Sequence, residues 1–125
     1  MTRTLRTVLA VVALALVSAC GGSEKGGPAG NEQAASQVPP GAKRVMMIDI
    51  KYMPMELRIP KGTTVAWTND DQIPHSVTKR KGAGPMFDSG LKAPGTVYTQ
   101  KFDTKGTIYY YCTLHPNQIG KLIVV

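Results

Sequence analysis

A series of short β-type segments between residues 43 and 125 constrains the fold of this chain more than any other feature. These segments are rich in β-branched and aromatic residues, and Gly, Pro, Asn and Asp occur between them. No stretch has the apolar period of an amphipathic helix. The pattern predicts one all-β domain, either a sandwich or a barrel, with a core around Trp67, Phe102, Val45 and Leu122. The expected strands are residues 45–50, 57–59, 63–68, 76–78, 97–102, 108–112 and 122–125.

The first 19 residues are organised like a secretory signal peptide. Arg3 and Arg6 form a basic start, and an unbroken apolar run extends from residue 8 to residue 17. This run is too short to span a bilayer, which needs about 20 residues, but it fits the apolar part of a signal. The segment predicts an extracytoplasmic protein on the periplasmic or cell-surface side.

The signal ends in Val17-Ser18-Ala19-Cys20, which resembles a bacterial lipobox. In that class of signals the chain is cleaved before the cysteine and the thiol is acylated. Cys20 is therefore expected to anchor the protein to the cell membrane or the outer membrane. The alternative is an ordinary signal next to a stray cysteine. With Cys20 acylated, Cys112 is a lone thiol in an oxidising compartment, and metal ligation is its leading explanation.

Residues after the signal are dominated by Gly, Pro, Ser and Gln as far as residue 42. Such a segment buries too little apolar surface to offset the entropy cost of ordering it. We therefore expect residues 1–19 to be a lipoprotein signal peptide and residues 20–42 to be the acylated cysteine with a flexible linker. Residues 43–125 then form the single small domain.

The strongest chemical signal is the loop that carries Cys112 and His115. The Cys-x-x-His spacing places a thiolate and an imidazole close enough to bind one ion. His75 is the only other histidine, and it opens a different expected strand. Two imidazoles and one thiolate suit copper in a trigonal site with a weak axial ligand.

Other chemistries use the same residue types. A zinc site with three protein ligands and a Cys–His nucleophile pair both remain open on this loop alone. Haem attachment needs Cys-x-x-Cys-His, which the sequence lacks. No orienting acid or oxyanion motif stands near the pair, and two histidines cannot build the second copper cluster of an oxidase. We therefore expect no enzymatic activity.

Three stretches, taken in order, resemble the cupredoxins, which are the type 1 blue copper proteins, and in particular their amicyanin, pseudoazurin and plastocyanin-like members. The first is Trp-Thr-Asn at residues 67–69, followed by Pro-His at 74–75. The second is Phe-Asp-Ser-Gly at 87–90, and the third runs from 109 to 125 and contains Cys-x-x-His-Pro. The resemblance covers nearly all of the domain and implies a Greek-key β-sandwich.

By this resemblance, His75, Cys112 and His115 are the equatorial ligands of one type 1 copper ion. Asn69 is then expected to join the His75 loop to the Cys112 loop by hydrogen bonds. Gln118 departs from the family, because it stands where most members carry an axial methionine. An amide oxygen is expected to take that place, as in the stellacyanin branch that it resembles; otherwise the site is three-coordinate.

The resemblance implies an electron carrier that passes single electrons between protein redox partners. The exposed edge of His115 would be the electron exit, surrounded by an apolar docking patch of Pro74, Met86, Leu114 and Pro116. We expect a monomer. The alternative function is an envelope copper-binding lipoprotein that buffers or delivers copper.

The charge of the chain is positive, with 15 Lys and Arg against 8 Asp and Glu. The imbalance suits an anionic partner or a membrane surface, although it also serves solubility. The basic residues are scattered except at 79–81, and no nucleic-acid-binding motif is present, so no nucleic-acid partner is expected.

Overall fold

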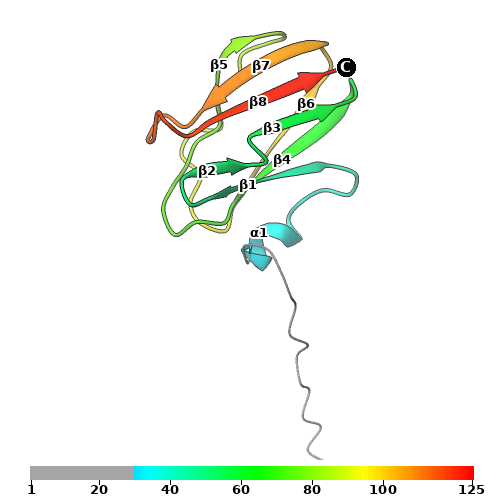
Figure 1. Cartoon of the computed structure of the whole chain (residues 1–125). Helices are drawn as coiled ribbons and strands as arrows, with labels where there is room; N and C mark the ends of the chain where they lie inside the picture. Colours follow the sequence, from blue (N-terminus) through cyan, green and yellow to red (C-terminus); the bar gives the residue numbers. More distant parts are fainter. Residues whose placement is uncertain (1–29) are drawn as a thin grey trace, which may run out of the picture.

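The structure is a computed structural model that describes residues 30–125, so the expected signal peptide and Cys20 lie outside the described residues. Within this range, two four-stranded sheets stack face to face (Figure 1). The predicted all-β domain is confirmed, and it is a sandwich. The first sheet has the order β2-β1-β4-β6, with β2 at Lys51–Met53, β1 at Lys43–Ile48, β4 at Thr63–Asn69 and β6 at Val97–Phe102. The second has the order β3-β8-β7-β5, with β3 at Glu56–Ile59, β8 at Ile119–Val124, β7 at Gly106–Tyr111 and β5 at Thr78–Gly82.

Both sheets are mixed, because β1 pairs with β4 in parallel and β3 pairs with β8 in parallel. Several strands alternate between buried and more exposed positions, as a sheet with one face in the core requires, whereas the last five residues of β4 are all buried. In β8, for example, Leu122 and Val124 are buried, whereas Ile123 between them is only partly buried. Where the burial alternates, one face of the strand lies in the core and the other lies at the surface.

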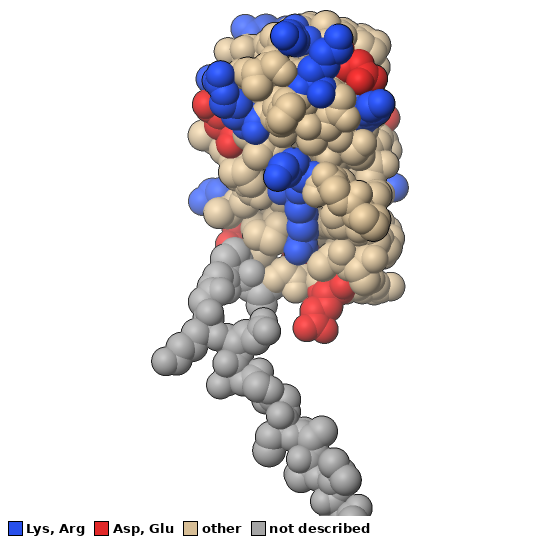
Figure 2. All heavy atoms as spheres, turned by 90° about the vertical axis from the view of Figure 1, so that its right-hand side faces the viewer, with Lys and Arg blue, Asp and Glu red and all other residues tan. Residues whose placement is uncertain are grey.

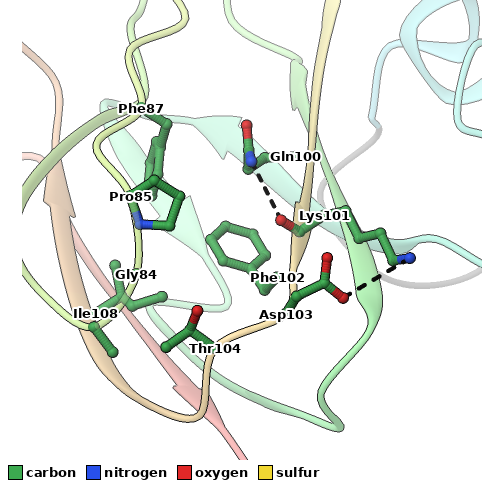
Figure 3. Close-up of a pocket in the computed structure, with 10 residues that line it drawn as sticks. Gly84, Pro85, Phe87, Gln100, Lys101, Phe102, Asp103, Thr104 and Ile108 are labelled. Carbon is green, nitrogen blue, oxygen red and sulfur yellow. Dashed lines mark hydrogen bonds and ion pairs between the residues drawn. The ribbon is translucent and has the colours of Figure 1, made fainter.

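The core is built around Trp67, which is fully buried in the middle of β4. Its ring lies 5.5 Å from that of Tyr110, 5.8 Å from that of Tyr98 and 6.0 Å from that of Phe102. The four expected core residues are all buried, which confirms the prediction. Figure 3 shows Pro85, Phe87 and Phe102 among the residues that line a pocket. The volume of this pocket is about 260 Å³. None of the expected metal ligands lines this pocket.

Residues 30–42 differ from the flexible linker that the composition predicted, because they pack on the domain. Helix α1 spans Glu32–Ser36, and the side chain of Asn31 caps it by accepting hydrogen bonds from the amides of residues 33 and 34. Ala34 is fully buried. The backbone N–H of Asn31 donates to Asp70 Oδ1 over 2.6 Å, and Gln37 Nε2 donates to the carbonyl of Gly95 over 3.0 Å. The Asn31 cap, the buried Ala34 side chain and these two hydrogen bonds hold the segment on the domain despite its polar composition.

The N-terminal helix is short, and none of the helices in residues 30–125 has the length and apolarity that a membrane span requires.

Figure 2 shows Lys and Arg side chains spread over the visible face, with uncharged surface between them. The basic run at 79–81 does not act as one surface patch. Lys79 is buried, and its ammonium donates a hydrogen bond to the carbonyl of Ala83 over 2.9 Å.

Candidate metal centre

Two segments that are distant in the sequence meet at the candidate metal centre. His75 lies in the connection between β4 and β5, and Cys112 directly follows β7. His115 lies three residues later in the β7–β8 connection. The backbone of His75 is fixed by two hydrogen bonds with Lys92, of 3.1 Å and 2.7 Å. The two sheets therefore bring His75 and the Cys112 loop together.

The donor atoms of these three residues face one another. His75 Nδ1 lies 4.0 Å from Cys112 Sγ, and His115 Nδ1 lies 3.7 Å from the same sulfur atom. All three candidate ligand atoms lie within 4.8 Å of one another. His75 and Cys112 are fully buried, whereas His115 is only partly buried. An ion bound between the three atoms would be shielded from water by the protein around His75 and Cys112. His115 would connect it to the protein surface.

The chain from Cys112 to Gln118 closes on itself by backbone hydrogen bonds. The amide of Cys112 donates to the carbonyl of Gln118 over 3.0 Å, and the amide of Gln118 donates to the carbonyl of His115 over 2.8 Å. The loop thus holds the thiol, the imidazole and the Gln118 backbone in one compact unit.

The Gln118 side chain is 1% exposed, and neither its oxygen nor its nitrogen has a hydrogen-bond partner. A buried amide without partners costs free energy, so its presence needs an explanation. A metal ligand in the holoprotein is such an explanation. The set of thiolate, two imidazoles and a spare amide oxygen matches the donors that copper accepts in trigonal sites with a weak axial oxygen. The residues therefore fit a copper ion.

The hydrogen-bond link between the two metal loops comes from Ser76, which the sequence analysis missed. Its backbone N–H donates to Cys112 Sγ over 3.3 Å, and its hydroxyl accepts from the amide of Thr113 over 2.9 Å. Tyr52 donates to the Ser76 carbonyl over 2.6 Å. The position directly after a ligand histidine was the only available signal for Ser76.

Asn69 does not make the link that was expected of it. Its side-chain nitrogen donates to the carbonyls of Ile73 and Lys92, both over 2.9 Å, and its oxygen accepts from the amide of Asp71. Asn69 therefore shapes the His75 connection and ties it to the segment around Lys92. None of these hydrogen bonds reaches the Cys112 loop. At the end of β4, the Asn69 side chain bonds to the residues that follow it and to Lys92 instead.

Asp71 is a second residue that the sequence analysis missed. Its Oδ2 lies 2.6 Å from His75 Nε2. Burial acts to raise the pKa of the Asp71 carboxyl, but hydrogen bonds from the amide of Ile50, from His75 and from the amide of Asp49 outweigh it and hold that pKa below its usual range. Because an ionised carboxylate only accepts hydrogen bonds, the proton of a neutral His75 lies on Nε2. The lone pair of Nδ1 then faces Cys112.

The four apolar residues of the expected docking patch are all exposed. Met86 is 71% exposed and Leu114 is 50% exposed, so neither belongs to the core. Pro74 and Pro116 are exposed as well. The exposure of Leu114 and Met86 is what a docking patch requires.

Comparison with known proteins gives a consistent result. The family model described as copper binding proteins of the plastocyanin/azurin family matches residues 41–125. The chain is 35% identical to an amicyanin of Paracoccus denitrificans over 126 residues, which covers 96% of this chain and 95% of that protein. It is 33% identical to an amicyanin of Paracoccus versutus, with 98% and 96% covered.

Solved structures agree with the sequence matches. An amicyanin variant in its Cu(I) form superposes with a TM-score of 0.67 at 33% identity, covering 74% of this chain and 90% of that chain. An amicyanin variant in the oxidised state gives the same values. A purple cupredoxin from Nitrosopumilus maritimus has a TM-score of 0.61 at 31% identity and covers 66% of this chain and 99% of its own.

Proposed function

The chain belongs to the plastocyanin/azurin family of copper-binding proteins, the cupredoxins, and on that basis we propose that it is an extracytoplasmic electron carrier with one type 1 copper ion. His75, Cys112 and His115 would be the equatorial ligands, and Gln118 the axial ligand. The observation that carries the proposal is the convergence of one sulfur and two ring nitrogens within 4.8 Å. The partnerless amide of Gln118 supports the axial role.

Copper supplies a one-electron couple when it is bound in such a site, and the chain supplies its fixed surroundings. The Ser76 amide and the His75–Asp71 contact hold two ligands in place before any metal enters. Because His75 and Cys112 are buried, water would not reach the ion from the protein interior. A site whose ligands stay in place in both oxidation states needs little rearrangement on electron transfer. That amicyanin variants have been solved in Cu(I) and oxidised forms supports this function.

The partly exposed edge of His115 is the proposed route for electrons to a partner protein. Exposed Met86 and Leu114, with the neighbouring prolines, offer an apolar surface suited to brief docking. Substitution of Leu114 by Glu should slow electron exchange with the physiological partner and leave the reduction potential nearly unchanged. Equal rates in the parent and the variant would place the docking surface elsewhere.

Reversible redox cycling separates an electron carrier from a copper buffer. The copper-loaded protein should pass through repeated cycles of reduction and oxidation with one copper per chain retained in the presence of a Cu(I) chelator. Loss of the copper to the chelator on the first reduction would favour buffering or delivery.

The lipid anchor and the domain boundaries are separate proposals. Cys20 would carry the lipid, and the folded unit would extend to residue 30, because residues 30–42 pack on the sandwich. Fractionation of the Cys20→Ser variant tests the anchor, since the variant should leave the membrane pellet. Sequencing its N-terminus controls for an uncleaved signal. A processed variant that stays in the pellet as firmly as the parent would contradict the anchor.

A further inference from the structure

The carboxylate of Asp71 joins the candidate metal centre to the turn between β1 and β2. Its Oδ1 accepts a hydrogen bond from the amide of Asp49 over 2.7 Å. Its Oδ2 accepts one from the amide of Ile50 over 3.0 Å and one from His75 Nε2 over 2.6 Å. The Asp71 side chain therefore accepts hydrogen bonds from both a surface turn and a candidate ligand.

The turn needs such a partner because its backbone is unfavourable for its residues. Asp49 has a φ of 52° and Ile50 a φ of 55°. Two consecutive positive φ values are typical of the two-residue hairpin turn that usually contains Asn-Gly or Asp-Gly. A β-branched residue such as Ile50 is rarely found in this region. Both amides of the turn point to the Asp71 carboxylate, and successive amides in such turns bind anions. The carboxylate thus offsets part of the cost of the turn.

The His75 ring depends on the same carboxylate. The bonds to Lys92 fix the backbone of His75 but not the direction of its ring. Among the described contacts, the ring itself is held by Asp71 on the Nε2 side and faces Cys112 Sγ on the Nδ1 side. The ring is fully buried, so water does not replace either partner. Removing the carboxylate would take away the hydrogen-bond acceptor on the Nε2 side of the ring, and with it the preference for one tautomer.

We propose that Asp71 is a positioning residue that sets the tautomer of His75 and makes metal binding and the order of the β1–β2 turn depend on each other. This inference rests on the proposed copper function. A hydrogen-bond acceptor on the outer nitrogen of a ligand histidine orients the ring and increases its basicity. Because coupling between two sites is reciprocal, an ion held by His75 also stabilises the turn. A more basic ligand favours Cu(II) over Cu(I), so loss of the carboxylate should raise the reduction potential.

The test uses variants of the purified full chain in which the turn no longer requires Asp71. Ile50→Gly removes the steric conflict of the positive φ without altering a contact of His75, and it is the matched control. Ile50→Gly with Asp71→Ala removes the carboxylate in that background. Ile50→Gly with Asp71→Leu keeps a side chain of similar size without an acceptor, and it serves if the alanine variant does not fold.

The first measurement is the nitrogen NMR spectrum of the histidine rings in the metal-free protein. The control should show one His75 tautomer with the proton on Nε2, and both Asp71 variants should show a mixture or a different tautomer. If His75 keeps the single Nε2–H tautomer without Asp71, the proposal is overturned and Asp71 only caps the turn. This result does not depend on copper, so it remains informative even if the proposed function fails.

The second measurement is amide hydrogen exchange at Asp49 and Ile50 with and without copper. In the parent, copper should slow exchange at both amides. Without Asp71, exchange should be faster by more than about tenfold, which is the factor that loss of a hydrogen bond to a charged group implies, and copper should no longer change it. An undiminished copper effect in the Asp71 variants would contradict the coupling. The variants should also have a higher reduction potential than the Ile50→Gly control, and an equal or lower one would contradict the basicity argument.

Discussion

The aromatic core around Trp67 and the polar cluster around Cys112 are two buried regions of one small domain that are stabilised in different ways. In the core, Trp67 packs against Tyr98, Phe102 and Tyr110, and apolar surface removed from water provides the free energy. Trp67 Nε1 and the Tyr110 hydroxyl lack partners there, but they belong to large rings whose remaining surface is packed. In the polar cluster, hydrogen bonds of Ser76 and Asp71 hold the candidate ligands, and the side-chain amide of Gln118 has no hydrogen-bond partner.

The difference indicates that the core stabilises the fold. The polar cluster keeps the candidate ligands in position, but it lowers the stability of the metal-free protein. Substitutions in the core should therefore lower stability with or without copper. Substitutions in the cluster should mainly change copper binding and redox behaviour, and some should even stabilise the metal-free protein.

Leu122→Ala should give the largest loss of stability. Leu122 is fully buried in β8. Truncation of a buried leucine leaves a cavity and typically lowers the free energy of unfolding by about 2–5 kcal/mol. Urea unfolding of the metal-free variant measures this. Ile123→Ala, on the outer face of the same strand, is the control and should cost clearly less. Similar losses for both would mean that the inner face of β8 does not carry the core.

His75→Ala should weaken copper binding by more than about 100-fold, because loss of an outer hydrogen-bond partner alone costs 10–100-fold. That corresponds to at least about 2.7 kcal/mol of binding free energy. Competition with a chelator of known affinity measures the change. Leu114→Ala, at an exposed neighbour of His115, should bind copper like the parent. If His75→Ala also retains the parent affinity, His75 is not a ligand.

Gly120→Ala should lower stability by about 1–3 kcal/mol in both forms, as overpacked sites do. A Cβ atom at Gly120 would lie 2.1 Å from Cζ of Tyr110, which is buried on the adjacent strand. Adding Tyr110→Leu should recover part of the loss by removing the clash. If the double variant is no more stable than the sum of the two single changes predicts, the two side chains are not in conflict.

Gln118→Met should have the smallest effect on stability and the opposite sign. Removing the partnerless amide should stabilise the metal-free protein by about 1 kcal/mol. With copper, a softer axial donor favours Cu(I), so the reduction potential should rise. Unfolding and protein-film voltammetry measure the two effects, with Asn117→Met at an exposed neighbour as the control. An unchanged or lowered potential would mean that Gln118 does not act on the metal.

The sequence predicted the core residues and also the three side chains that the structure brings together at the candidate metal centre. Trp67 and Leu122 stood out as large apolar residues in segments of β type, the Cys-x-x-His spacing pointed to Cys112 and His115, and His75 was the only other histidine. The folded segment at α1 was not predicted, since its stability comes from contacts with Asp70 and Gly95 that are distant in the sequence. Ser76 and Asp71 were missed for the same reason: a hydroxyl and a carboxylate in a loop reveal their role only when their partners are known.

The visible absorption spectrum of the protein loaded with Cu(II) tests the central claim most directly. The account predicts an intense band from thiolate-to-copper charge transfer. It also predicts that Cys112→Ser abolishes this band, whereas Cys20→Ser, the matched change at the other cysteine, leaves it intact. A protein that binds one metal ion per chain at His75 and His115 but shows no such band, or a band that survives Cys112→Ser, would contradict the assignment.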